Sequence, residues 1–393
     1  MIITDFTDQD LYKISMGQAV WRQYPKAEGR YEFCVRTKNP TIPLADIADD
    51  IRKEIESLES VVLTNDEYCF IQTAMPWIKQ DYLDWLSIYR FNPLVDVDIK
   101  TEPNGGVLIS PHGKWFHNIF YEVLILAIVE ELYCSKISGM DADQAEKKAI
   151  DRLKPKMDML QNYPGLKFTD FATRRRYSKR NHRAVLSYLK RNCPNLVGTS
   201  NVLFARELGL KPIGTVAHEF FMAHLALTDR IDQAQKRALH VWLQEYGENL
   251  GTALTDTFTS EAFWRDFDKV LANSFSGIRQ DSGDPFKFGW DAIRRYWELG
   301  IDPMTKFVIF SDSLDFPKMI HLFETFNGQI QVGFGIGTNL GNDVGIEPLS
   351  IVMKLMELNG VPLVKLSDSD GKVMGDASMV KSVREAYGVK SCV

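Results

Sequence analysis

The sequence is poor in cysteine and has no disulfide or zinc-binding pattern. Its five cysteines are scattered through 393 residues without a CxxC spacing, at Cys34, Cys69, Cys134, Cys193 and Cys392. An odd and widely spaced set argues against a disulfide framework and against a structural zinc site. We therefore expect reduced, mostly structural thiols.

Long apolar runs are also absent. The most apolar stretch, VLILAIV (123–129), is bounded by Glu122, Glu130 and Glu131. It is far shorter than the ~20 residues that cross a bilayer. The first twenty residues lack the basic and apolar regions of a signal peptide. These absences predict a cytoplasmic protein with no membrane association.

An excess of positive charge is missing as well. The chain has 46 Lys and Arg against 52 Asp and Glu, a net charge of −6. This balance argues against general binding of nucleic acid, although a local basic patch can still bind an anionic substrate. The hydrophobic fraction of 45% is ordinary for a globular protein, and the length suits one large or two medium domains.

The first part of the chain mixes helical and strand-like patterns. Helical periodicity covers 10–23, 46–60 and 66–89, and the runs RYEFCVRT and GGVLIS resemble strands, so we expect an α+β domain. A long buried helix is predicted from Pro111 to about Ser138. We place the N-terminal domain at residues 1–130, joined by part of 355–393, and a catalytic domain at 131–354.

Beyond that helix, short apolar runs alternate with polar or glycine-rich loops and amphipathic helices. Successive units of this kind favour a parallel sheet with right-handed crossovers, either closed as a barrel or left open. In both cases the chemistry gathers beyond the carboxyl ends of the strands. In one of these helices, Trp290, Ile293, Tyr296 and Trp297 share one face.

The segment GIRQDSGDP (277–285) carries charged residues where a strand is predicted to end. Arg279, Asp281 and Asp284 are expected to project into a common opening at that edge. Asp284 stands directly before Pro285, so capping of the following helix explains it equally well. Capping explains Arg279 and Asp281 less well.

Two further segments suggest anion binding. The loop GFGIGTNLG (333–341) offers backbone N–H groups to a phosphate, although a series of tight turns would have the same composition. The run DFATRRRYSKRNHR (170–183) places Arg174, Arg175 and Arg176 after an apolar stretch, where one or two can grip a pyrophosphate. Phe171 is either a stacking platform or a core residue.

Two histidines follow another strand-like run. His218, preceded by Gly214 and Thr215, is a candidate nucleophile toward a phosphoryl group, because neutral imidazole is nucleophilic near pH 7. A hydrogen-bonded core histidine is the alternative for His218, and it is favoured for His224. Their spacing of six residues disfavours a shared metal.

Seven segments together resemble one family. They are, in order, DFTDQDLYK, DFATRRRYS, GTSNVLFA, PIGTVAHEF, GIRQDSGDP, FSDSLD and GFGIGTNLG. In this order they resemble the nicotinate phosphoribosyltransferase family over almost the whole chain. The opening TDxDLYK and the segment GTxAHEF resemble the nicotinate enzymes more than the related nicotinamide phosphoribosyltransferases.

The resemblance implies a reaction and a fold. The reaction joins nicotinate to the phosphoribosyl group of phosphoribosyl pyrophosphate, gives nicotinate mononucleotide and pyrophosphate for NAD biosynthesis, and is coupled to ATP hydrolysis with Mg²⁺. The implied fold is an irregular α/β barrel of the type II phosphoribosyltransferase kind with an N-terminal α+β sandwich domain. A homodimer with shared active sites is also implied.

The resemblance also assigns roles to residues. His218 matches the histidine that ATP phosphorylates, and Asp281 and Arg279 complete the catalytic set. Asp281 and Asp284 are the expected magnesium ligands. Positions that match substrate contacts are Tyr12, Phe171, Arg174, Thr215, Arg279, Ser311, Asp312, Gly335, Gly337 and Thr338.

Each of these substrate contacts has a specific partner in the family. Tyr12, arriving from the other subunit, and Phe171 sandwich the pyridine ring. Thr215 and Arg279 contact nicotinate, and Arg174 holds pyrophosphate or phosphate oxygens. The glycine loop around Thr338 binds the 5-phosphate, while Ser311, Asp312 and Asp281 face ribose and Mg²⁺.

Other classes of function stay open. A nicotinamide or quinolinate phosphoribosyltransferase would share most of these motifs. A phosphosugar- or flavin-binding barrel enzyme would share the glycine loop, but no lysine stands out as a Schiff-base former. A phosphohistidine carrier would explain His218 and would leave GIRQDSGDP without a role.

Overall fold

The computed structural model describes residues 1–389, apart from the side chain of Asp370. The chain forms two compact units, each built from two stretches of sequence. Unit 1 comprises Met1–Gly214 and Ile336–Lys354, and unit 2 comprises Thr215–Gly335 and the chain from Leu355 onward. The sequence analysis placed the domains at 1–130 and 131–354, which is a different division. Those domain boundaries stay a prediction.

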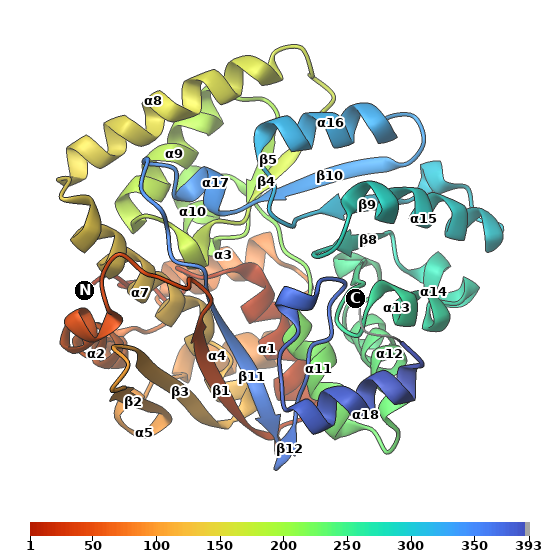
Figure 1. Cartoon of the computed structure of the whole chain (residues 1–393), viewed down its shortest axis with the longest axis horizontal. Coiled ribbons are helices and arrows are strands. Elements are labelled where there is room, and N and C mark those ends of the chain that lie inside the picture. Colours follow the sequence, from red (N-terminus) through yellow and green to blue (C-terminus); the bar gives the residue numbers. More distant parts are fainter. Residues whose placement is uncertain (390–393) are drawn as a thin grey trace. The chain divides into compact units, whose positions relative to one another are not determined.

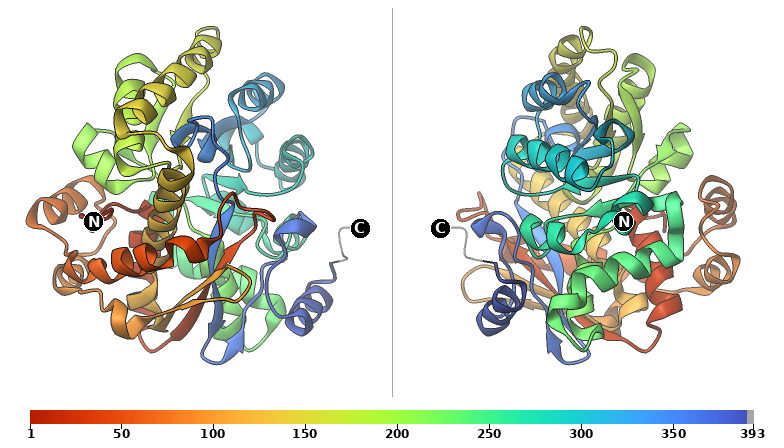
Figure 2. Two further views of the ribbon diagram at one scale, coloured as in Figure 1. Left: turned by 60° about the vertical axis from the view of Figure 1, so that its left-hand side comes forward. Right: turned by 90° about the vertical axis from the view of Figure 1, so that its right-hand side faces the viewer.

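Unit 1 contains most of the helices and a small antiparallel sheet (Figure 1). Its helices are α1 (Leu11–Gln23), α2 (Ala48–Glu56), α3 (Asn65–Ala74), α4 (Gln80–Ile88), α5 (Pro93–Asp96), α6 (Trp115–Asn118), α7 (Tyr121–Ser138), α8 (Ala142–Leu160), α9 (Lys179–Asn192), α10 (Val202–Leu208) and α17 (Thr338–Gly341). Its strands are β1 (Glu28–Val35), β2 (Val97–Thr101), β3 (Val107–Lys114), β4 (Phe168–Asp170), β5 (Leu196–Thr199) and β6 (Lys211–Pro212). Helices α8 and α9 lie side by side in both views of Figure 2.

Unit 2 alternates strands and helices. Its helices are α11 (His218–Leu227), α12 (Ala234–Tyr246), α13 (Ser260–Asp266), α14 (Lys269–Ser274), α15 (Pro285–Glu298), α16 (Phe316–Phe326) and α18 (Ala377–Tyr387). Its strands are β7 (Thr252–Leu254), β8 (Gly277–Gln280), β9 (Phe307–Phe310) and β12 (Val361–Pro362). Figure 1 shows α15 and α16 beside β9 and β10. Two strands span the boundary between the units, namely β10 (Gln331–Ile336) and β11 (Ile351–Leu358).

The larger sheet is parallel and has seven strands in the order β6-β5-β4-β10-β9-β8-β7. Helices connect most of its successive strands, as expected for βα units. The second sheet has the order β12-β11-β1-β3-β2, in which β3 pairs antiparallel with β1 and β2, and β11 pairs antiparallel with β12. These two sheets confirm the expected fold class, an irregular α/β barrel with an N-terminal α+β layer.

Several helix predictions need correction. The helix over 10–23 is confirmed by α1, but residues 111–114 continue β3 and α7 begins only at Tyr121. Gly113 has a φ of +126°, which a helix does not allow. The predicted helix 66–89 is interrupted between α3 and α4 around Pro76 because proline does not continue a helix.

The amphipathic reading of α15 is also only partly right. Ile293 and Tyr296 are buried, while Trp290 and Trp297 are exposed. The buried face is therefore shifted away from the two tryptophans.

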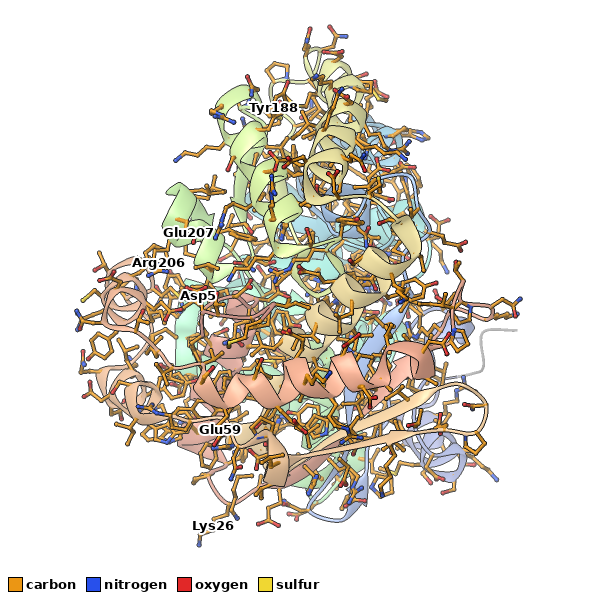
Figure 3. The ribbon with its side chains drawn as sticks, turned by 90° about the vertical axis from the view of Figure 1, so that its left-hand side faces the viewer. Asp5, Lys26, Glu59, Tyr188, Arg206 and Glu207 are labelled. Carbon is orange, nitrogen blue, oxygen red and sulfur yellow. The ribbon has the colours of Figure 1, made fainter. Side chains whose placement is uncertain are left out.

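Charged side chains cover the surface of unit 1. Arg206 of α10 lies 3.7 Å from Asp5, and its neighbour Glu207 pairs with Arg183 of α9 (Figure 3). Such partly exposed pairs contribute little to stability. In the part of the chain that the structure describes, no helix is long and apolar enough to cross a membrane.

Helix α7 carries a buried carboxyl that ties a loop to the core of unit 1. Glu130 accepts hydrogen bonds through Oε1 from Asn342 Nδ2 at 2.9 Å and from the Leu349 backbone N–H at 3.1 Å. Its second oxygen, Oε2, is buried without a hydrogen-bond partner. Burial raises the pKa of Glu130 to about 8, so this group is mostly protonated at neutral pH.

Glu130 therefore predicts a pH-dependent stability. Its pKa is higher in the folded state than its ordinary value of 4.5. Its contribution to the free energy of unfolding is therefore lost as the pH rises from about 4.5 to about 8. Relative to the wild type, Glu130→Gln should remove this decline in the free energy of unfolding, which can be measured by urea denaturation at several pH values. Glu130→Ala, which leaves two N–H groups unpaired, should cost about 1–3 kcal/mol. Parallel pH profiles of wild type and Glu130→Gln would contradict the assignment.

Candidate active site

Three neighbouring strands of unit 2 end at the same edge of the sheet. Leu254 of β7 pairs with Arg279 of β8, and Gln280 of β8 pairs with Phe310 of β9, all in parallel. The residues directly beyond these strands therefore gather at one edge. They include Asp256 after β7, Asp281 to Asp284 after β8, and Ser311 with Asp312 after β9.

His218 is the first residue of α11 and lies among these loops. Its Nδ1 is 3.0 Å from Thr257 Oγ1, and its Nε2 is 3.0 Å from Asp281 Oδ2 and 3.9 Å from Asp256 Oδ1. Burial, together with the ammonium of Lys365, lowers the pKa of His218 to about 4. The imidazole is thus neutral at physiological pH, as a nucleophile requires.

Arg279 connects the predicted residues of this edge. Its Nε donates to Ser311 Oγ at 2.9 Å, its Nη1 donates to Thr215 Oγ1 at 3.0 Å, and its Nη2 lies 3.1 Å from Asp281 Oδ1. Burial raises the pKa of Asp281, but Arg279, His218 and Lys365 together outweigh burial and hold that pKa well below its usual range. Asp281 is therefore an anion that touches both Arg279 and His218.

Lys365 is a member of this cluster that the sequence analysis did not identify. Its Nζ lies 2.9 Å from His218 Nε2 and 3.5 Å from Asp256 Oδ2, and the residue is only 4% exposed. Burial raises the pKa of Asp256, but Lys365, His218 and the hydrogen bond from Ser282 together outweigh burial and lower that pKa. The available signal was a lysine inside the apolar run VPLVKLS, because a buried lysine needs a partner.

A segment after β12, residues 365–372, covers these loops, and we call it the C-terminal strap. The Leu366 N–H donates to Thr257 O at 2.8 Å, and the Asp368 N–H donates to Ser282 Oγ at 3.0 Å. Lys372 Nζ donates to Asp281 O at 2.9 Å and also pairs with Asp312. The strap therefore contacts the loops that follow β7, β8 and β9.

Other predicted residues lie in unit 1. The Phe171 N–H donates to Ile336 O at 2.8 Å, and a Cβ added at Gly337 would lie 3.1 Å from Phe171 O. The glycine loop and Phe171 are thus in close backbone contact, and Thr338 begins α17 just beyond. Gly335 belongs to β10 in unit 2.

The arginines of the basic run differ in role. Arg176 is fully buried and pairs with both oxygens of Asp8, at 2.5 and 2.8 Å, so it serves the core of unit 1. Arg174 is partly exposed and lies 4.0 Å from Glu122, which also pairs with Lys13 at 2.6 Å. Tyr12 precedes Lys13 in α1, and its ring centroid is 5.7 Å from the Lys13 ammonium.

A single buried carboxylate is surrounded by several cations here. Lys354 is 3.9 Å from Glu122, so three cations, including Lys13 and Arg174, surround one acid. Burial raises the pKa of Glu122, but these cations outweigh it and lower that pKa. Glu122 is therefore an anion held by three cations.

The two expected magnesium ligands do not form a prepared metal site. Asp281 uses Oδ1 for Ser311 and Arg279 and Oδ2 for His218. Asp284 is exposed and caps α15 by accepting hydrogen bonds from two backbone N–H groups, as the capping explanation predicted. Residues 1–389 contain no group of three or more His, Cys, Asp or Glu side chains suited to a metal ion.

His224 belongs to the core, as the structural alternative predicted. It is fully buried and its Nδ1 is 2.7 Å from Phe220 O, one helical turn earlier in α11.

A parallel α/β sheet that gathers a buried histidine, two aspartates, an arginine and a lysine at its carboxyl edge is typical of an enzyme. Comparison with known proteins gives the family. Residues 7–130 match the nicotinate phosphoribosyltransferase N-terminal domain, and residues 166–391 match the nicotinate phosphoribosyltransferase family. The chain belongs to this family and is an enzyme of it.

Relatives agree over the full length. A nicotinate phosphoribosyltransferase of Photorhabdus laumondii is 40% identical over 99% of this chain and 96% of its own. The crystal structure of the Vibrio cholerae nicotinate phosphoribosyltransferase has a TM-score of 0.93 at 38% identity, covering 99% of this chain and 94% of the other. The Porphyromonas gingivalis enzyme gives 0.92 at 36% identity, with coverage of 99% and 100%.

The strap predicts a position where only glycine fits. Gly283 has a φ of +78°, and a Cβ there would lie 3.0 Å from Asp368 Cβ in the strap. Gly283→Ala should therefore lower the free energy of unfolding by about 1–3 kcal/mol and displace the strap. Urea denaturation measures the loss, and Gly371→Ala is the matched control because a Cβ there meets nothing within 4 Å. Equal stability of the two variants would contradict this account.

Proposed function

We propose that this enzyme transfers the 5-phosphoribosyl group of phosphoribosyl pyrophosphate to nicotinate, releasing pyrophosphate and nicotinate mononucleotide for NAD biosynthesis or salvage. We further propose that the reaction is coupled to ATP hydrolysis through phosphorylation of His218. Family membership supports the reaction. The observation that carries the coupling is the neutral, buried His218 held between Thr257, Asp281 and Lys365.

Arg279 is the proposed partner of the nicotinate carboxylate. A guanidinium has five N–H donors in one plane, and Ser311, Thr215 and Asp281 fix its orientation. Thr215 adds a hydroxyl beside it. The flat pyridine ring would stack on an aromatic side chain, which is the role proposed for Phe171 and for Tyr12 of a neighbouring subunit.

The reacting sugar needs charges of both signs. As the bond from C1 to the diphosphate breaks, positive charge builds on the ribose and negative charge on the leaving group. Asp281 is held as an anion by Arg279 and is the proposed partner of the ribose, together with Ser311 and Asp312. Arg174 is the proposed cation for the pyrophosphate, and Gly335, Gly337 and Thr338 are proposed to bind the 5-phosphate through their loop.

ATP is proposed to act through His218. The ring nitrogen that carries the lone pair attacks the γ-phosphorus, the bond to the ADP oxygen breaks, and the ring proton stays on the opposite nitrogen. The neutral ring is surrounded by two negative charges, on Asp256 and Asp281, and by two positive charges, on Arg279 and Lys365. A phosphoryl group adds up to two negative charges, which would draw the cations toward it and change substrate affinity.

Magnesium is expected from the polyphosphate substrates. Mg²⁺ typically binds through one or two carboxylates plus substrate phosphates and waters. The engagement of Asp281 with Arg279 and His218, and of Asp284 with α15, does not fit a preformed pair of ligands. No step of the proposal therefore depends on the metal, and the homodimer and the cytoplasmic location likewise stay predictions.

His218→Asn tests the coupling. Asparagine keeps a polar side chain but cannot accept a phosphoryl group from ATP, so stimulation by ATP should be lost while slow ATP-independent synthesis persists. A pyrophosphate-release assay with and without Mg-ATP measures both activities, and acid-labile phosphate on the protein should disappear. ATP stimulation of the variant equal to that of the wild type would contradict the phosphohistidine.

Arg279→Ala tests the contact with the nicotinate carboxylate. Loss of a charged hydrogen bond costs about 1.5–3 kcal/mol, so the KM for nicotinate should rise by roughly 10- to 150-fold, far more than that for phosphoribosyl pyrophosphate. Arg279→Lys is the control that keeps the charge without the planar fork. Assays with nicotinate, nicotinamide and quinolinate also separate the alternative substrates. An equal rise in both KM values would count against the assignment.

A further inference from the structure

One nitrogen of His218 faces two partners with opposite demands. Nε2 lies 3.0 Å from Asp281 Oδ2 and 2.9 Å from Lys365 Nζ. An aspartate carboxylate can only accept a hydrogen bond, and an ammonium can only donate one. Since Nε2 either carries a proton or carries a lone pair, it can satisfy only one of the two at a time.

The two choices are the two tautomers of the neutral ring. With the proton on Nδ1, that nitrogen donates to Thr257 Oγ1 and Nε2 accepts from Lys365. With the proton on Nε2, that nitrogen donates to Asp281 and Nδ1 accepts from the Thr257 hydroxyl. A hydroxyl both donates and accepts, so the contact of 3.0 Å at Thr257 suits either tautomer.

The other partners of Lys365 and Asp281 decide between them. Asp281 keeps Arg279 and Ser311 when it loses the imidazole. In the described part of the chain, the ammonium of Lys365 has one hydrogen-bond partner, His218 Nε2, and its next polar neighbour, Asp256 Oδ2, is 3.5 Å away. A buried ammonium without a hydrogen bond is costly, so the contact with Lys365 prevails.

We propose that Lys365 is a positioning residue that sets the tautomer and the charge of His218, placing the proton on Nδ1 and the lone pair on Nε2 in the resting enzyme. In that state Thr257 and Lys365 occupy both ring nitrogens, so the ring is neutral but not free to attack. It becomes a nucleophile at Nε2 when the ammonium moves to a neighbouring anion. This role rests on the proposed function of His218.

Asp256 supplies one alternative anion. Its Oδ2 is 3.5 Å from the ammonium, and its Oδ1 is buried without a hydrogen-bond partner. The phosphates of a substrate would supply another. Once the ammonium has moved, the lone pair of Nε2 is free to attack a phosphoryl group, while the proton stays on Nδ1 and donates to Thr257 Oγ1.

Four charged groups surround the ring of His218. They come from the loop after β7 (Asp256), from the end of β8 and its loop (Arg279 and Asp281) and from the strap (Lys365). The two aspartates favour a protonated ring, while burial and Lys365 oppose it and prevail. Removing the ammonium should therefore let the two aspartates raise the pKa of His218.

The test compares Lys365→Met with the wild type by two-bond ¹H–¹⁵N NMR of histidine-labelled protein, with His218→Asn used to assign the signal. In the wild type at pH 7 we expect Nδ1 protonated and Nε2 unprotonated. In Lys365→Met we expect the proton on Nε2 and a pKa of His218 raised by about 1 unit or more. The acid limb of ATP-dependent phosphorylation should move up by the same amount.

Two further variants serve as controls. Lys372→Met removes an ammonium from the same strap that does not touch His218, and it should leave the tautomer unchanged. Lys365→Arg keeps a donor at the same position and should retain the wild-type tautomer. It keeps the proposal testable if Lys365→Met does not fold. A protonated Nε2 in the wild type, or the same pKa of His218 in the wild type and Lys365→Met, would overturn the proposal. If ATP phosphorylates no histidine, the coupling fails while the NMR result still decides the role of Lys365.

Discussion

The site in unit 2 depends on the buried contact between His218 and the charged groups that surround it. The ring is neutral because burial and Lys365 together outweigh two neighbouring carboxylates. Each carboxylate is in turn held as an anion by a cation, Asp281 by Arg279 and Asp256 by Lys365. Removing any one charge leaves another unpaired in a buried place, so the groups stabilise one another only as a complete set.

Backbone geometry makes this set possible. Parallel strands bring the ends of β7, β8 and β9 to one edge, and the C-terminal strap then joins the three loops through backbone and side-chain hydrogen bonds. The strap carries Lys365 and Lys372 in addition to these bonds. The same segment therefore restrains the loops and supplies their compensating positive charge, which explains why a tight contact at Gly283 matters beyond local strain.

Much of this was predictable from local sequence. Asp284 before Pro285 predicted the cap of α15, strand ends followed by polar loops predicted the location of Arg279 and Asp281, and the order of seven segments predicted the family. The helix start at Pro111 was wrong because periodicity does not distinguish the start of a helix from the end of a strand before Gly113. The predicted helix 66–89 ran through Pro76, where the chain leaves the helix because proline does not continue it. The buried Arg176 could not be separated from Arg174, because the difference lies in Asp8, far away in the chain.

The sequence alone determined the order of strands and helices, the polar loops at the strand ends and the family, because each of these depends on neighbouring residues or on motifs in succession. Only the tertiary structure decided which charges meet. Lys365 lies 147 residues beyond His218, and it stands in a run that reads as an ordinary apolar strand. Its contact with His218 Nε2 exists because the chain returns over the loops of unit 2, and such a return leaves no periodicity in the residues themselves.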